Sequence, residues 1–220
     1  MEETPARGHE KTTVRVRDRE ATRKQLLQAV GTILARQGFA TIGVNAVARE
    51  ARVDKVLIYR YFGSLQGLIG AFGREGDFWP TIEELAGGDL DSFLRLPLPE
   101  RFSTLARMYV RGLRKRPLTQ EILAWEMVER NDLTFGLEAL REATHERMLR
   151  IAGEPVGATI DIEAVSALIG AAINYLVTRS GRSLTVFGGV DISSEQGWQR
   201  LERVLDSLIK ALFAASEKGG

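Results

Sequence analysis

The apolar positions of this chain repeat at the spacing of helices. In residues 26–34, 102–113 and 201–213 the apolar side chains stand three, four or seven positions apart, and such residues share one face of an α-helix. Residues 162–177 are apolar almost all round, so a helix there must be covered on nearly every side. No run alternates apolar and polar residues convincingly enough to predict a sheet. The pattern predicts an all-α protein.

Capping residues, glycine and proline divide this pattern into separate helices. The first expected helix begins at Thr22, with Gln25 as its capping partner, and ends at Gly38. Residues 78–99 hold several prolines and glycines, which predict one short helix and loops. Further helices are expected over residues 64–72, 102–116, after Pro117, and over residues 133–153, 162–178 and 198–214.

Residues 44–62 contain two short helical patterns separated by a tight turn. Val44, Val47, Ala48 and Ala51 form the apolar stripe of the first pattern, and Val53, Ile58 and Phe62 continue it in the second, for which Asp54 is the expected cap. The side chains left outside are Lys55, Val56, Leu57, Tyr59, Arg60 and Tyr61.

These outward side chains suit contact with DNA. Lysine, arginine and tyrosine donate hydrogen bonds to phosphate oxygens, whereas small apolar side chains fit the methyl group of thymine. Asn45, Arg49 and Arg52, on the preceding helix and turn, complete the candidate DNA-binding set. The segment therefore predicts a DNA-reading helix-turn-helix. A helical hairpin in an unrelated core is the alternative, and it does not explain the exposed tyrosines.

Charge is divided unevenly along the chain. The net charge is +1 overall, yet residues 1–62 carry twelve Lys or Arg against seven Asp or Glu, and the remainder carries eighteen against twenty-two. A basic first quarter is expected if only the N-terminal part meets a polyanion. Residues 1–20 lack periodic apolar positions and predict a disordered basic tail, either a solvated leader or an arm along DNA. Residues 21–72 then form the DNA-binding domain, and residues 73–220 a larger helical domain.

The composition narrows the compartment and the chemistry. Cysteine is absent, which removes disulfides and thiolate sites and favours a reducing cytoplasmic compartment. No apolar run approaches the roughly 18–20 residues that span a bilayer, so no membrane association is expected. Catalysis has little support, because the histidines, His9 and His145, lie in the tail and on a charged helix. No cofactor or metal is expected, although Glu142, His145 and Glu146 could share one helix face.

The order of these features resembles the TetR family of bacterial transcriptional regulators. The specific likeness covers residues 22–72, and beyond them only the helical layout is similar. The resemblance implies that Lys55 and Tyr59 contact phosphates, that Tyr61 takes a place often held by histidine, and that Val56 and Leu57 lie where bases are read.

Three positions depart from the family pattern. Arg52 stands where glycine usually makes the turn, so it must adopt a left-handed backbone or shift the turn. Ile42 and Gly43 replace the hydroxyl residues that usually start the second helix, and Leu65 replaces a common lysine. The cations of Arg49, Arg52 and Arg60 are expected to substitute for the missing phosphate contacts.

The resemblance also implies a C-terminal domain that dimerises and binds a small-molecule effector. Aromatic residues at helical spacing are more often core than ligand contacts. Glu126 and Glu129, beside Trp125, either meet a cationic ligand, are solvated, or pair with nearby arginines. The candidate ligand-binding residues are Phe102, Tyr109, Trp125, Glu126, Phe135 and Tyr175.

Together these features predict a homodimeric repressor that binds a palindromic double-stranded operator and releases it when an effector binds. One reading helix covers few base pairs, and two related by a dyad reach two half-sites. Residues 162–178 and 198–214 are the expected dimer interface. The alternative is a helical small-molecule binding or signalling module without operator binding, and an enzyme is the third choice.

Overall fold

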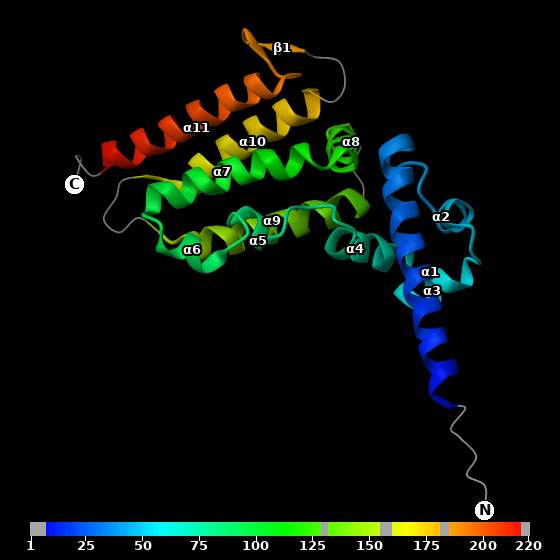
Figure 1. Ribbon diagram of the computed structural model, residues 1–220. Coiled ribbons are helices and arrows are strands. Elements are labelled where there is room, and N and C mark those ends of the chain that lie inside the picture. Colours follow the sequence, from blue (N-terminus) through cyan, green and yellow to red (C-terminus); the bar gives the residue numbers. More distant parts are fainter. Residues whose placement is uncertain (1–7, 129–131, 155–159, 181–184, 217–220) are drawn as a thin grey trace, which may run out of the picture.

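The computed structural model describes residues 8–128, 132–154, 160–180 and 185–216 (Figure 1). Over these ranges the chain forms eleven helices and one short β-ladder, which confirms the predicted all-α fold. The N-terminal helices are α1 (Gly8–Gln37), α2 (Val44–Ala51), α3 (Val56–Phe62) and α4 (Leu65–Glu75). The later helices are α5 (Ile82–Leu85), α6 (Leu90–Arg95), α7 (Leu98–Arg114), α8 (Pro117–Glu126), α9 (Asp132–Ala152), α10 (Ile162–Ser180) and α11 (Glu195–Ser216).

Helix α1 begins earlier than the sequence indicated. Residues 8–20, expected to belong to a disordered tail, form its first turns. Thr22 is not the cap, because its hydroxyl donates to the carbonyl oxygen of Asp18 at 2.7 Å. The expectation failed because it relied on apolar periodicity, whereas residues 9–20 contain no glycine or proline to stop a helix. The rest of the expected tail, residues 1–7, lies outside the described residues.

A small hairpin between α10 and α11 also differs from expectation. Strand β1 (Val186–Phe187) pairs antiparallel with β2 (Val190–Asp191). Gly188 and Gly189 connect them with φ values of 56° and 77°, the positive values that a two-residue hairpin turn requires. Strands of two residues are too short to leave an alternating pattern in the sequence.

The first core lies among α1, α2, α3 and α4. Leu26, Val30 and Leu34 of α1 are fully buried there, together with Ile58 of α3 and Leu68 of α4. The core continues beyond residue 72, because its buried members include Phe78, Ile122 and Leu137. Side-chain packing is therefore continuous across residue 72, and the domain boundary predicted there stays a prediction.

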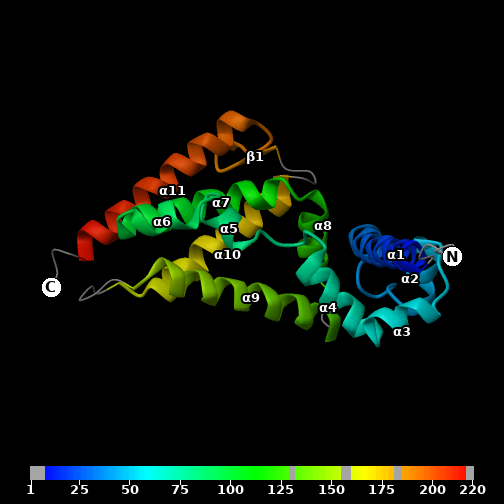
Figure 2. The same cartoon turned by 60° about the horizontal axis from the view of Figure 1, so that its bottom comes forward.

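The C-terminal part is organised around α7. Helices α10 and α11 both pack on α7, as does α5, and both views show α9 on the opposite side of α7 from α11 (Figures 1 and 2). Buried Phe102, Met148 and Phe213 form one core there, and Leu113, Val177 and Trp198 form another. In both views α1, α2 and α3 lie at the opposite end of the molecule from the end of α11 (Figures 1 and 2).

Helices α10 and α11 leave apolar side chains uncovered. Leu168 and Tyr175 of α10 are exposed, as are Val204, Leu208 and Leu212 of α11. Helix α10 also has the length and mean hydropathy of a membrane span, with only 17% of that window buried. The apolar pattern of this helix predicts that nearly every side is covered, and the single chain does not cover it.

Candidate nucleic-acid interface and ligand cavity

The turn between α2 and α3 places Arg52 in a left-handed backbone conformation. Arg52 ends α2 in the left-handed conformation, with φ 55° and ψ 42°, and its N–H donates to the carbonyl oxygen of Arg49 at 3.2 Å. Of the two alternatives predicted for Arg52, the left-handed backbone is the one observed. Because a side chain in this conformation costs roughly 1–2 kcal/mol, the turn holds strain that glycine would remove.

Helix α3 is fixed at its start and at its centre. The N-cap position is Lys55, one residue later than expected, and the carboxylate of Asp54 accepts a hydrogen bond from the N–H of Val56 at 2.8 Å. Ile58 is fully buried in the first core. These two anchors set which face of α3 points outward.

The outward face of α3 is basic and aromatic. Val56 is 52% exposed and Tyr59 is 54% exposed, and Lys55 and Arg60 are exposed beside them. On α2 and the turn, Asn45, Arg49 and Arg52 are also exposed. Seven of the predicted DNA-binding residues are thus available to a partner.

Leu57 and Tyr61 do not stand fully outside, contrary to expectation. Both are half-buried. Val53, Leu57 and Tyr61 stand four residues apart, and their side chains pack on the first core. The guanidinium of Arg19 lies 5.5 Å from the ring centroid of Tyr61. The expectation missed this contact because it treated that part of α1 as a tail.

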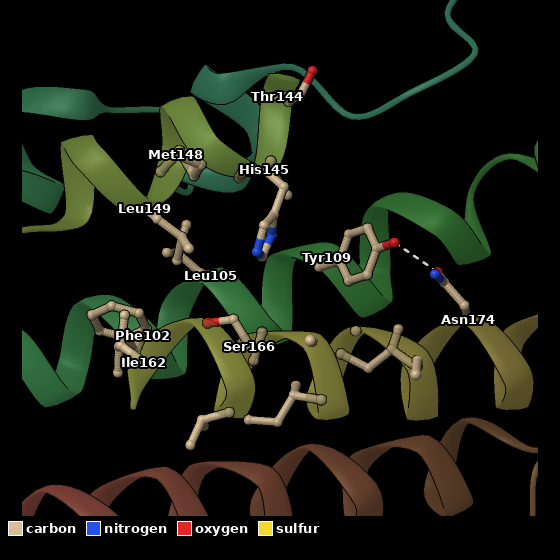
Figure 3. Close-up of a pocket in the computed structure, with 18 of the residues that line it drawn as sticks. Phe102, Leu105, Tyr109, Thr144, His145, Met148, Leu149, Ile162, Ser166 and Asn174 are labelled. Atoms are coloured by element: carbon tan, nitrogen blue, oxygen red, sulfur yellow. Dashed lines mark hydrogen bonds between the residues drawn. The ribbon is translucent and has the colours of Figure 1, made fainter. Parts of the chain in front are cut away.

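A cavity of about 430 Å³ lies within the C-terminal helices. Its walls come mainly from α7, α9, α10 and α11. Figure 3 shows Phe102 and Tyr109 entering it from α7 and His145 projecting into it from α9. The hydroxyl of Tyr109 donates to Oδ1 of Asn174 at 2.6 Å and joins α7 to α10. Burial raises the pKa of Tyr109, so the hydroxyl stays a donor.

The predicted ligand-binding residues are divided by the structure. Phe102 and Tyr109 line the cavity, and Glu126 and Phe135 line a second hollow of about 300 Å³. Trp125 lines neither hollow. It packs on the first core, and its indole N–H donates to the carbonyl oxygen of Ala35 at 3.3 Å.

Tyr175 also lines neither hollow, because its ring packs against the hairpin. Its ring centroid lies 5.5 Å from that of Phe187. Of the two glutamates considered beside Trp125, Glu126 pairs with an arginine, and Glu129 lies outside the described residues.

Helix α9 contributes a cavity face that sequence reasoning missed. Glu138, Arg141, Glu142, His145 and Met148 all line the cavity. They stand three or four positions apart, so helical periodicity was the signal that could have found them. It was missed because charged positions were assigned to solvent. In the described ranges, Glu142, His145 and Glu146 do not form a group suited to holding a metal ion.

A buried ion pair adjoins the two hollows, because Arg141 lines both of them and Glu126 lines the second. Arg141 donates from Nη1 to Oε1 of Glu126 at 2.9 Å, and its Nη2 lies 2.8 Å from Oε2. Burial raises the pKa of Glu126, and the nearby charge of Arg141 opposes that rise. Arg141 also lies over the ring of Trp79, 5.5 Å from its centroid. This guanidinium is therefore held on two sides.

An exposed basic helix in a helix-turn-helix, and a cavity among the C-terminal helices, are the features of a ligand-responsive helix-turn-helix transcriptional regulator. Residues 26–72 match the family described as bacterial regulatory proteins, tetR family. This match, together with the curated repressor described below, supports the TetR family of bacterial transcriptional regulators for this chain. Its function is therefore DNA-binding regulation and not enzymatic catalysis, as predicted.

A curated relative and solved structures are similar to this chain over most of their length. The HTH-type transcriptional repressor SCO4008 of Streptomyces coelicolor is 24% identical over 185 residues, which cover 81% of this chain and 90% of that protein. A TetR family transcription regulator from Marinobacter aquaeolei VT8 has a TM-score of 0.58 at 20% identity, covering 86% of this chain and 97% of that chain. NalD, the secondary repressor of the MexAB-OprM multidrug efflux pump in Pseudomonas aeruginosa, has a TM-score of 0.57 at 19% identity, covering 84% and 96%. These two likenesses show a common fold.

Proposed function

We propose that the chain is a cytoplasmic repressor that binds a palindromic operator as a homodimer and releases it when a small molecule occupies the cavity. The observation that carries the proposal is the packing of the cavity helix α9 on α4, the helix that follows the reading helix. A site for DNA and a site for a ligand thereby share one continuous path of packed helices.

The exposed side chains of α2 and α3 supply the DNA contacts. Asn45, Arg49, Arg52, Lys55, Tyr59 and Arg60 are the donors expected to meet phosphate oxygens. Val56 is exposed at the start of α3 and is the apolar side chain best placed to read bases. Leu57 and Tyr61 contribute the part of each side chain that the first core leaves uncovered.

Dimerisation is proposed through α10 and α11. Leu168 is 73% exposed and Leu208 is 55% exposed, and solvent contact of such side chains is unfavourable by about 25 cal/mol for each Å² of apolar surface. A second copy packed against the same helices would cover them and would carry a second reading helix related by a dyad. This apolar face suits a protein partner, and no membrane association is proposed.

Close packing between α4 and α9 supplies the coupling. A Cβ added at Gly73 would lie 2.7 Å from Cδ2 of Leu140 and 2.9 Å from Cδ2 of Leu137. Only Gly63 and Ser64 separate α4 from α3. A ligand that binds more tightly to one position of α9 therefore shifts α4 and the spacing of the two reading helices. The dimer then favours the spacing that does not fit the operator, and the DNA is released.

Selection of bound duplexes from a random DNA pool tests the proposal. We expect enrichment of two inverted half-sites about one or more helical turns apart. The Lys55→Ala/Tyr59→Phe variant should weaken binding to every sequence and reduce its salt dependence, whereas Val56→Ala should change the preferred sequence. The alternative, a ligand-binding module without operator binding, predicts that no sequence is enriched.

A further inference from the structure

We propose that the cavity selects an organic cation, that is, an aromatic or otherwise apolar molecule with a positive charge. The inference rests on the proposed ligand-responsive function and specifies the chemical class of the ligand. It follows from which charges of the cavity wall are already neutralised and which are left without a partner.

The cation of the cavity wall is already engaged. Among the described residues that line the cavity, Arg141 is the only lysine or arginine. It is paired with Glu126 through Nη1 and Nη2. Trp79 covers its guanidinium from another side. An anionic ligand would have to displace a carboxylate whose side chain is only 10% exposed, and that carboxylate would be left buried without its partner.

Two carboxylates of the wall are not neutralised. Glu138 and Glu142 line the cavity and are exposed to solvent. Among the described residues neither has an ion pair or a hydrogen bond. They stand four positions apart on α9, and their like charges repel each other. A cation placed between them would relieve this repulsion and be attracted by both.

The remaining wall is apolar and aromatic. Phe102, Tyr109 and Phe213 line the cavity together with Trp79. The rings of Trp79 and Tyr109 lie 5.5 Å apart, as do those of Phe102 and Phe213 at 5.4 Å. Aromatic faces attract cations that have lost part of their hydration. The cavity volume of about 430 Å³ lies within the range of roughly 300–1,000 Å³ that holds drug-sized molecules.

The Tyr109 hydroxyl adds an acceptor to this wall. Its proton is donated to Asn174, so its oxygen can still accept a hydrogen bond from a ligand. An ammonium or amidinium N–H would find this acceptor, whereas a carboxylate would not. Charge, aromatic surface and hydrogen-bonding capacity therefore favour the same class of ligand.

Tetraphenylphosphonium and tetraphenylborate are suitable probes, because they have nearly the same size and shape and opposite charge. Binding of each to the full-length protein is measured by isothermal titration calorimetry at 0.15 M salt. We expect the phosphonium to bind at least tenfold more tightly, which corresponds to about 1.4 kcal/mol. Equal affinity, tighter binding of the borate, or no binding of either ion would overturn the inference.

Two double variants test whether the preference for the phosphonium arises in the cavity. Glu138→Gln/Glu142→Gln should reduce the phosphonium preference to less than about threefold while leaving the melting temperature nearly unchanged, since both side chains are exposed. The control, Glu146→Gln/Glu163→Gln, removes two carboxylates from α9 and α10 that do not line the cavity, and it should retain the tenfold preference. Loss of the preference in the control alone, or its persistence in the first variant, would refute the assignment.

The DNA selection separates this inference from the proposed function. If an operator is enriched and the phosphonium preference is absent, the ligand class is wrong and the regulatory function stands. If the preference is present and the phosphonium leaves the operator complex intact, the ligand class stands and the proposed release of DNA is wrong.

Discussion

The hydroxyl of Tyr109 donates a hydrogen bond to Oδ1 of Asn174 at 2.6 Å, and this contact joins α7 to α10 along the cavity wall. Tyr109→Phe should lower the free energy of unfolding by about 1 kcal/mol, because the half-buried amide loses its partner. Asn174→Ala should lower it by a similar amount. Urea denaturation of both single variants and the double variant measures the coupling. Strictly additive losses would show that the two groups do not interact.

Arg116 should stabilise the junction of α7 and α8. Its side chain is 7% exposed, and it donates to both carboxylate oxygens of Glu84, at 2.9 Å and 2.8 Å, and to the carbonyl oxygen of Gly112. Arg116→Ala is expected to cost about 2 kcal/mol at pH 7, because charged hydrogen bonds are lost while Glu84 returns to water. Arg150→Ala, which removes a surface pair with Glu146, should cost less than about 0.5 kcal/mol.

The loss at Arg116 should depend on pH in a definite direction. Burial alone would raise the pKa of Glu84, but hydrogen bonds from the Thr81 N–H and from Arg116 outweigh it and hold the pKa below the ordinary 4.5. A carboxyl group with a lowered pKa stabilises the fold above its ordinary value, and that contribution is lost as the pH falls through the folded-state pKa. The difference in unfolding free energy between wild type and Arg116→Ala should therefore narrow below pH 4.5. A gap that widens in acid would contradict the pairing.

Arg52→Gly should affect stability and DNA binding in opposite directions. Relief of the left-handed conformation, less the entropic cost of glycine, should raise the free energy of unfolding by about 0.5–1 kcal/mol. Loss of the cation should weaken operator binding and reduce its salt dependence by about one phosphate contact. Thermal unfolding and fluorescence anisotropy at several salt concentrations check the two effects. Unchanged DNA binding would remove Arg52 from the interface.

Gly73→Ala should disturb the contact between α4 and α9. The added methyl group meets Leu137 and Leu140 below 3 Å, so we expect a loss of about 1–3 kcal/mol and a changed concentration of ligand for half-maximal operator release. Gly136→Ala is the matched control, because nothing lies within 4 Å of its added Cβ on α9. That control should be neutral or stabilising by up to about 1 kcal/mol. Equal effects of the two substitutions would argue against coupling through Gly73.

Leu208→Asp should produce monomers if α11 forms the dimer interface. A carboxylate in an apolar interface is strongly unfavourable, and the side chain is exposed in the single chain, so the fold itself should persist. Leu94→Asp, at an exposed leucine on α6, is the control and should remain dimeric. Sedimentation velocity at micromolar concentration distinguishes the two. A dimeric Leu208→Asp protein would exclude this part of α11 from the interface.

Local chemistry made parts of the site predictable. The conformation of Arg52 and the hydrogen bond of Asp54 depend on residues next to each other in the chain. Arg52 adopts the left-handed one of its two predicted alternatives, and Asp54 accepts from the Val56 N–H although the N-cap position is Lys55. Leu57 and Tyr61 were misplaced because their burial depends on the first core and, for Tyr61, on Arg19 of a longer α1. A helix surface is exposed or covered according to neighbours that are distant in the sequence.

The sequence by itself determined the helical class, the helix-turn-helix and the family, because periodicity, capping and turn conformation act within a few residues. Only the tertiary structure decided which side chains form the cavity. His145 and the carboxylates of α9 read as solvated, and Trp125 and Tyr175 read as candidate ligand contacts, until the packing of α7, α9, α10 and α11 was known. A cavity is enclosed by helices far apart along the chain, and their relative positions are set by long-range packing that no local pattern encodes.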